Sequence, residues 1–226
     1  MKNMTKCSTG ITFLDLLLKG GYDYDTITTM YGPSGSGKTN LCLVAAVKIA
    51  ESGKKVIIID TEGGIAVERI KQITSNYEEI LSRMIFFHPV NFEEQKAVME
   101  QLKEMVSDNV GLIVVDSISM LYRLELGKNE EVYDVNAALG RQLATLVEVS
   151  RRRKIPVLLT TQVYSDFENR DMVKMVGGDL LKYGSKCLIE LLRFTNCRGL
   201  VLRKHRSLPE GLEVKFRIVD KGLEEV

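Results

Sequence analysis

The segment 32–39 constrains the fold of this chain more than any other feature. It reads Gly-Pro-Ser-Gly-Ser-Gly-Lys-Thr, with an apolar run at 27–31 before it and a helix-forming, mostly apolar stretch at 41–47 after it. Its glycines allow backbone conformations that other residues resist, so that successive N–H groups can converge on one phosphate. A strand, a glycine-rich turn and a helix in this order therefore predict a phosphate-binding loop at the positive end of a helix dipole.

The last residues of this loop have distinct expected roles. Lys38 supplies a mobile positive charge for the β- and γ-phosphate oxygens, and the hydroxyl of Thr39 can bind the magnesium ion that bridges them. The alternative is a Gly/Ser turn that happens to precede Lys-Thr, and the flanking strand and helix disfavour it. We expect a nucleotide to be bound by Gly32, Pro33, Ser34, Gly35, Ser36, Gly37, Lys38, Thr39 and Asn40.

Composition bounds the class of protein. A chain of 226 residues is long enough for one substantial core, and we expect a single domain over 1–226. The 31 basic and 30 acidic residues demand neither nucleic acid nor an anionic membrane, so any DNA-binding surface must be local. The scattered cysteines suggest neither a zinc site nor a disulfide framework. Without a signal-like or membrane-length apolar segment, the sequence predicts a soluble cytoplasmic protein with no membrane partner.

Apolar runs and helical patterns alternate along the chain. Runs of strand length lie at 27–31, 55–60, 84–87, 110–116, 155–161 and 187–193, and helices are indicated at 39–52, 66–75, 92–107 and 132–153. This alternation predicts an α/β fold with a mostly parallel sheet covered on both faces by helices. Asn91 is expected to cap the third helix. The segments 199–204 and 211–219 indicate an antiparallel hairpin at the sheet edge.

Polar side chains follow three of these runs, at the sheet edge where parallel sheets bind their ligands. Asp116 is placed to hold magnesium, with Ser117 as an indirect partner. Glu62 is the candidate general base that accepts a proton from, or orients, the attacking water, and Gln162 is a neutral amide that can sense the γ-phosphate. Lys38, Glu62 and Gln162 are thus the expected catalytic residues, and Thr39 and Asp116 the metal ligands. For each acid, a helix cap or a solvated loop residue is the alternative.

The order of these motifs resembles that of the RecA-fold recombinases, closest to archaeal RadA and the eukaryotic strand-exchange proteins. The shared motifs are GxxxxGKT at 32–39, Asp60-Thr-Glu-Gly63, Ile113–Ser117 with Leu121-Tyr122-Arg123, Thr161-Gln-Val163 and Gly177-Gly178. The resemblance implies a RecA-like P-loop NTPase core that binds ATP and Mg²⁺. It also places Arg69 where the family stacks an arginine on adenine, with an exposed helix residue as the alternative.

Full-length recombinases carry an N-terminal helical DNA-binding domain ahead of the ATPase core, and we expect this chain to lack it, because its sequence begins almost directly at that core. It is therefore similar to the short archaeal paralogues of RadA, and we expect no long filaments formed by the usual route. The segment 163–176 takes the place of a DNA-contacting loop, in which Tyr164 and Phe167 would stack on bases while Arg170 and Lys174 contact the backbone. The alternative is that both aromatic residues anchor the loop to the core, and its three acids oppose phosphate binding.

The basic segment 203–206 reads Arg-Lys-His-Arg. Lys204 and Arg206 resemble the K-x-R pair that other RecA-fold rings insert into a neighbouring subunit's ATP site, where such a cation accelerates hydrolysis. The alternatives are a hairpin turn with solvated charges and a patch for DNA phosphates.

The expected function follows from the resemblance. We expect a DNA repair and homologous recombination protein that binds ATP and single-stranded DNA, hydrolyses ATP weakly and in a DNA-dependent way, and assists a RadA-type recombinase. A homodimer is the expected form of any self-association. The alternatives are a KaiC-like signalling ATPase, although those typically have paired catalytic glutamates where this chain has Glu62-Gly63, and a nucleotide-gated protein-binding module without significant hydrolysis.

Overall fold

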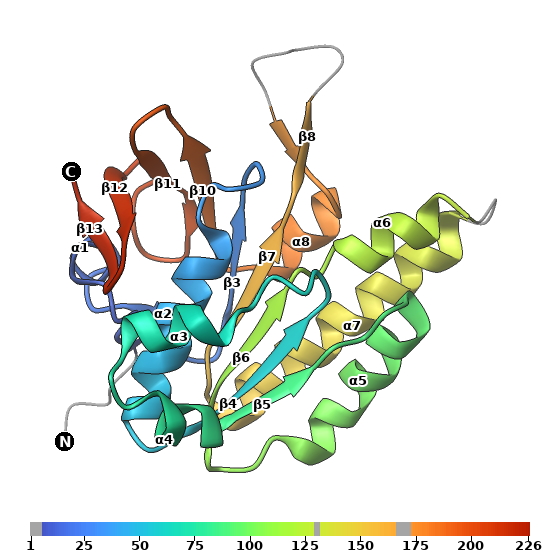
Figure 1. Cartoon of the computed structure of the whole chain (residues 1–226). Coiled ribbons are helices and arrows are strands. Elements are labelled where there is room, and N and C mark those ends of the chain that lie inside the picture. The colour runs from blue at the N-terminus through green and yellow to red at the C-terminus, as the bar shows by residue number, and fades with distance from the viewer. Residues whose placement is uncertain (1–5, 129–131, 166–172) are drawn as a thin grey trace.

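A single large sheet organises the chain. The computed structural model describes residues 6–128, 132–165 and 173–226, and within these ranges nine strands form one sheet in the order β13-β12-β11-β10-β3-β7-β6-β4-β5 (Figure 1). The six strands from β10 to β5 in this order are parallel, and β11, β12 and β13 are antiparallel. The strands of the sheet are β3 (Ile27–Tyr31), β4 (Lys55–Asp60), β5 (Met84–Phe87), β6 (Val110–Asp116), β7 (Val157–Thr161), β10 (Cys187–Arg193), β11 (Arg198–His205), β12 (Glu213–Val219) and β13 (Gly222–Glu225).

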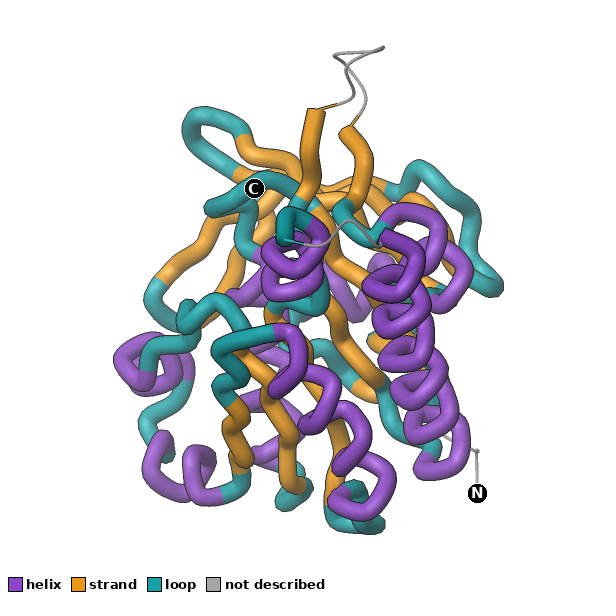
Figure 2. The backbone as a smooth tube through the Cα atoms, turned by 90° about the vertical axis from the view of Figure 1, so that its right-hand side faces the viewer, coloured by secondary structure: helices purple, strands orange, loops and turns teal. Residues whose placement is uncertain are grey.

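Helices cover both faces of this sheet (Figures 1 and 2). One face carries α1 (Thr12–Leu17), α2 (Lys38–Glu51), α3 (Val67–Ile73) and α4 (Tyr77–Ser82), and the other carries α5 (Phe92–Met105), α6 (Met120–Leu126), α7 (Val132–Arg153) and α8 (Gly178–Gly184). Strand alternation divides the apolar side chains between them. Val56 and Ile58 of β4 pack in the apolar core that includes α2, whereas Ile57 and Ile59 pack in the apolar core on the other face, which includes α5, α6 and α7. Burial on both faces explains why the central strands are continuous apolar runs.

Two short antiparallel pairs flank the sheet. The pair β1 (Lys6–Cys7) and β2 (Tyr22–Asp23) lies near the described N-terminal end. The pair β8 (Val163–Ser165) and β9 (Val173–Met175) projects from the edge at which the parallel strands end (Figure 2). The sequence did not indicate either pair, because each strand is too short to show periodicity.

Most expected elements are present with small shifts in their ends. Strands β3, β4, β5, β6 and β10 have the predicted bounds, and β7 begins at Val157, after Pro156. The expected C-terminal hairpin is confirmed as β11 paired with β12, but β13 lies beyond β12 and forms the outermost strand. The predicted cap is also present, because the Asn91 side chain accepts a hydrogen bond from the Glu94 N–H at 2.9 Å. The short helices α1, α4, α6 and α8 were not predicted.

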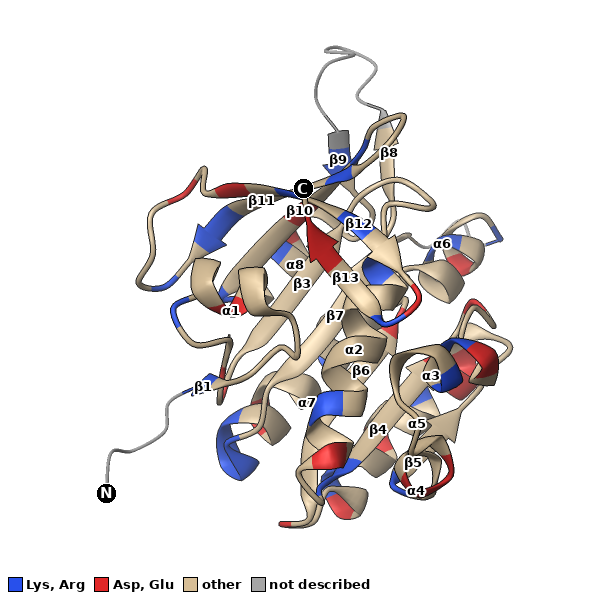
Figure 3. Cartoon of the chain, turned by 60° about the vertical axis from the view of Figure 1, so that its left-hand side comes forward, with Lys and Arg blue, Asp and Glu red and all other residues tan. Residues whose placement is uncertain are grey.

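Charged residues of both signs lie along the elements of the chain that Figure 3 shows. Figure 3 shows acidic and basic residues interspersed along most elements of the visible side. None of the helices in the described ranges combines the length and the apolar character needed to cross a membrane.

Candidate active site

The predicted phosphate-binding loop lies between β3 and α2, at the edge where the parallel strands end (Figure 1). Gly32 has φ +154°, and a Cβ there would lie 2.3 Å from the carbonyl oxygen of Leu191 in β10. Gly37 adopts a left-handed conformation, φ +103°, and starts α2. Both positions therefore require glycine for backbone reasons.

Lys38 closes this loop on itself. Its ammonium group donates to the carbonyl oxygens of Gly32 at 2.9 Å and Pro33 at 3.0 Å, and the residue is only 8% exposed. Burial lowers the pKa of Lys38, and the nearby carboxylates of Glu62 and Asp116 oppose that shift. The cation thus lies in the loop, and the carboxylates of Glu62 and Asp116 are close enough to affect its pKa.

The two expected metal ligands are in direct contact. The Thr39 hydroxyl donates to Asp116 Oδ2 at 2.6 Å, and the Thr160 hydroxyl donates to Asp116 Oδ1. Asp116 is 3% exposed, and burial raises its pKa while the two hydroxyl hydrogen bonds oppose that rise. Thr160 was not predicted, because only the pairing of β6 with β7 brings it beside Asp116.

Glu62, the expected general base, and Gln162, expected to sense the γ-phosphate, also contact each other. Glu62 Oε1 accepts hydrogen bonds from the Ser117 hydroxyl at 2.8 Å and from the Gln162 amide at 3.1 Å. Ser117 therefore contacts Glu62, across a cis peptide bond from Asp116. Glu62 is exposed, so its carboxylate is oriented by the protein and remains accessible to a substrate water.

Asp60 shapes the loop that carries Glu62, a role that the sequence analysis missed. Its carboxylate is 2% exposed and accepts the backbone N–H groups of residues 62, 63, 64 and 65 at 3.1, 2.8, 3.4 and 3.2 Å. A buried carboxylate surrounded by backbone donors fixes the path of the chain around it. The signal in the sequence was an acid followed at once by a glycine-containing turn, in which side-chain acceptors commonly satisfy backbone N–H groups.

The donor set of this site fits a nucleotide phosphate tail with Mg²⁺. Ser36 Oγ in the loop is buried and has no hydrogen-bond partner within the described part of the chain. Buried polar atoms of this kind are normally satisfied, so an orphaned hydroxyl beside Lys38 fits a ligand oxygen. Thr39 and Asp116 supply the hard oxygen atoms that Mg²⁺ prefers.

Arg69 forms several hydrogen bonds within the chain. Its guanidinium donates to Asn40 Oδ1 at 2.7 Å and to the carbonyl oxygens of Val219 at 2.9 Å, Gly222 at 3.0 Å and Asp220 at 3.0 Å. These bonds link α2 to the β12–β13 turn, and burial lowers the pKa of Arg69. Hydrogen bonds to a guanidinium lie in its plane, so adenine stacking on its face stays a prediction.

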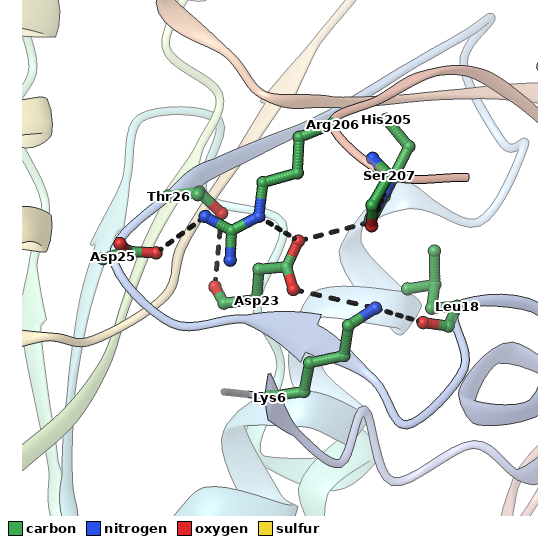
Figure 4. A network of polar contacts seen from close by, with 8 residues as sticks. All are labelled: Lys6, Leu18, Asp23, Asp25, Thr26, His205, Arg206 and Ser207. Atoms are coloured by element: carbon green, nitrogen blue, oxygen red, sulfur yellow. Dashed lines mark hydrogen bonds and ion pairs between the residues drawn. The ribbon is translucent and has the colours of Figure 1, made fainter. Parts of the chain in front are cut away.

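The two cations expected to reach a neighbouring subunit are held within this chain. Lys204 donates to the carbonyl oxygens of Lys182 at 2.6 Å and Ser185 at 2.9 Å. Arg206 forms ion pairs with Asp23 at 3.0 Å and Asp25 at 3.1 Å, and His205 lies 3.3 Å from Asp23 (Figure 4). A role in trans stays a prediction, and it would require these contacts to break.

Two of the expected DNA-contacting residues lie opposite each other on the β8–β9 pair. Tyr164 is 46% exposed and pairs in register with Lys174. Both line a groove of about 1200 Å³ that also includes Lys182, Tyr183 and Lys204. Phe167 and Arg170 lie outside the described residues. The structure therefore groups Tyr164 and Lys174 with a cation that the sequence analysis had assigned to another role.

Comparison with known proteins identifies the class. Residues 1–226 match the Rad51 family. The chain belongs to this family of RecA-fold proteins. This result and the mixed sheet confirm the fold class predicted from the sequence.

Individual relatives give a finer identification than the family model does. The chain is 42% identical over 213 residues to the DNA repair and recombination protein RadB of Methanococcus maripaludis, covering 93% of this chain and 97% of that protein. It is 41% identical over 211 residues to RadB of Methanocaldococcus jannaschii, covering 92% and 97%. The crystal structure of the RadB recombinase has a TM-score of 0.82 and 40% identity, covering 97% and 99%. The resemblance to short archaeal paralogues is confirmed, and the family is one of DNA repair and recombination.

Proposed function

We propose that this RadB-family protein binds ATP with Mg²⁺ at the loop 32–39, hydrolyses it slowly, and binds single-stranded DNA as an accessory to a RadA-type recombinase. One observation carries the proposal. The Thr39–Asp116 pair and the Glu62–Gln162 pair lie at the same edge of the sheet as Lys38, so that two oxygen ligands suited to a metal, an accessible carboxylate and an ammonium group lie near one another.

Backbone N–H groups and Lys38 hold the phosphates. Mg²⁺, when bound, neutralises charge on the phosphate oxygens. Thr39 and Asp116 would hold it, directly or through water. Burial raises the pKa of Asp116, and a bound cation would favour its charged form.

Glu62 orients the attacking water and accepts its proton. Ser117 and Gln162 fix the carboxylate through the two hydrogen bonds to Oε1. The backbone carbonyl of Gln162 accepts a hydrogen bond from the Val176 N–H at 3.0 Å, and this bond joins Gln162 to the segment that follows β9. A change at the terminal phosphate would thus reach the β8–β9 pair through one residue, whose side chain contacts Glu62 and whose backbone contacts Val176.

The groove beside this pair is the proposed site for single-stranded DNA. Tyr164 and the 75% exposed Tyr183 offer rings on which bases can stack, and Lys182 and Lys174 offer charges to the backbone. Stacking on an aromatic side chain contributes about 1–3 kcal/mol per base and tolerates any sequence.

Four variants test the proposal by separating nucleotide binding, turnover and DNA binding. Glu62→Gln should retain ATP and DNA binding and lose hydrolysis, whereas Lys38→Ala should lose nucleotide binding. Tyr164→Ala should weaken binding of a labelled oligonucleotide, while Tyr133→Ala, which removes another exposed tyrosine outside the groove, should not. Equal oligonucleotide binding by all four proteins would contradict the DNA site, and full hydrolysis by Glu62→Gln would contradict the assigned base.

Self-association and the recombinase partner need a separate measurement. The molecular mass in solution, with a non-hydrolysable ATP analogue and with purified RadA-type recombinase, should show a complex that depends on the nucleotide. An unchanged monomer mass under every condition would contradict both the dimer and the accessory role.

A further inference from the structure

Arg193 and Arg198, which belong to neither the catalytic nor the DNA-binding residues proposed above, lie beside the phosphate-binding loop. Arg193 ends β10 and Arg198 begins β11, and the two are directly paired across this hairpin. A Cβ at Gly35 would lie 3.4 Å from a terminal guanidinium nitrogen of Arg193, and Arg198 Nε donates to the Gly35 carbonyl at 3.1 Å. Both cations therefore meet at one residue of the loop.

The position of β10 explains this convergence. β10 runs parallel to β3, with Glu190 in register with Tyr31, the residue before Gly32. The two strands end at the same edge, and the last residue of β10 extends along the loop. Arg193 is exposed, so its guanidinium can reach a ligand seated in the loop.

This arrangement is electrostatically costly without an anion. Like charges placed directly opposite on antiparallel strands destabilise the pair. Among the described residues, no ion pair includes Arg193 or Arg198. Two adjacent guanidinium groups beside a phosphate-binding loop therefore favour an anionic ligand between or next to them.

We propose that Arg193 is a phosphate ligand of the bound nucleotide, supplied by the same chain, and that Arg198 fixes the loop through its hydrogen bond to the Gly35 carbonyl. This inference rests on the proposed ATP site. A guanidinium can bind two phosphate oxygens at once, which Lys38 cannot do. Nucleotide affinity then needs no cation from a second subunit, in agreement with the engagement of Lys204 and Arg206 within the chain.

Calorimetric titration of the dilute protein with Mg²⁺ and either ADP or a non-hydrolysable ATP analogue tests this assignment. Arg193→Gln should weaken binding of both nucleotides by about tenfold or more. Arg193→Lys should weaken it by less, because lysine keeps the positive charge but cannot bind two phosphate oxygens at once as a guanidinium does. The control is Arg217→Gln, an exposed arginine on β12 that strand alternation directs away from the face of Phe216. The nucleotide affinity of Arg217→Gln should match that of the wild type.

Two further readouts do not depend on turnover. The affinity difference between wild type and Arg193→Gln should shrink at high salt, because ions screen an exposed charge. The melting temperature of nucleotide-free Arg193→Gln should equal or exceed that of the wild type, since one of two opposed like charges is gone.

The outcomes separate this inference from the site on which it rests. If Lys38→Ala loses nucleotide while Arg193→Gln binds within twofold of the wild type, the role of Arg193 is wrong and the ATP site stands. If the wild type binds no nucleotide, both are wrong. A nucleotide-free Arg193→Gln that melts well below the wild type would also overturn the inference, because the side chain would then be structural.

Discussion

The buried carboxylate of Asp60 gives the sharpest test of how the active-site loop is built. It accepts backbone N–H groups from four consecutive residues, one of which is Glu62 itself. Asp60→Asn preserves size and shape but replaces one acceptor oxygen with an NH₂ group. If the remaining oxygen takes the place of Oδ1, the new NH₂ group faces the Ile65 N–H, which now bonds to Oδ2 at 3.2 Å.

The magnitude follows from that single lost acceptor and from the lost charge. A hydrogen bond to a charged group contributes about 1.5–3 kcal/mol, so we expect Asp60→Asn to lower the free energy of unfolding by about 2–3 kcal/mol. For a domain of this size that corresponds to roughly 4–12 °C in melting temperature. Hydrolysis should fall about tenfold or more, because Glu62 is displaced, whereas nucleotide affinity should change little.

Urea denaturation measures the first effect, and steady-state hydrolysis with a parallel nucleotide titration measures the second. The matched control is Asp108→Asn, whose side chain is 96% exposed and pairs with Arg153 only at the surface. That variant should unfold within about 0.5 kcal/mol of the wild type. If Asp60→Asn behaved like this control in both assays, the idea that Asp60 holds Glu62 in place would be refuted.

Three further predictions concern stability. Gly32→Ala should lower the melting temperature and abolish nucleotide binding, because its Cβ would lie 2.3 Å from the Leu191 carbonyl oxygen. Asn91→Ala removes the cap of α5 and should cost about 1 kcal/mol in urea denaturation. Burial lowers the pKa of His205 from 6.5 although Asp23 opposes the shift, so the unfolded chain binds the proton more tightly. The stability that the folded chain gains from keeping His205 uncharged is therefore complete above pH 6.5 and is lost as the pH falls below that value. His205→Gln should flatten this pH dependence of the melting temperature, measured in melting curves at a series of pH values.

Much of the fold was predictable because its signals are local. Buried parallel strands are short, continuous apolar runs, and β4 and β6 therefore have the bounds that the sequence indicated. The cap at Asn91 depends on a residue three positions away. Short or solvent-facing elements such as β13 and α8 have too few buried residues to produce a periodic pattern, and they were missed.

The roles of the cations were less predictable, because they depend on partners that are distant in the chain. For Lys204 and Arg206 the sequence left three roles open: a contact with another subunit's ATP site, solvated charges in a hairpin turn, and a patch for DNA phosphates. The structure adds contacts within the chain that the sequence did not indicate, because the end of β11 lies near Asp23 and Asp25, which pair with Arg206 (Figure 4). A run of basic residues does not reveal which acids the fold places next to it.

The sequence by itself determined the chemistry available at the site: a glycine-rich loop whose backbone can cradle a phosphate, with Lys38 and Thr39, and acids at the ends of two apolar strands. Only the tertiary structure decided which of these groups touch. Strand order brings Thr160 to Asp116 and Gln162 to Glu62, and it places Arg193 over Gly35. The physical reason is that local sequence sets the conformation of each strand, whereas the neighbours of that strand are set by burial of both sheet faces at once.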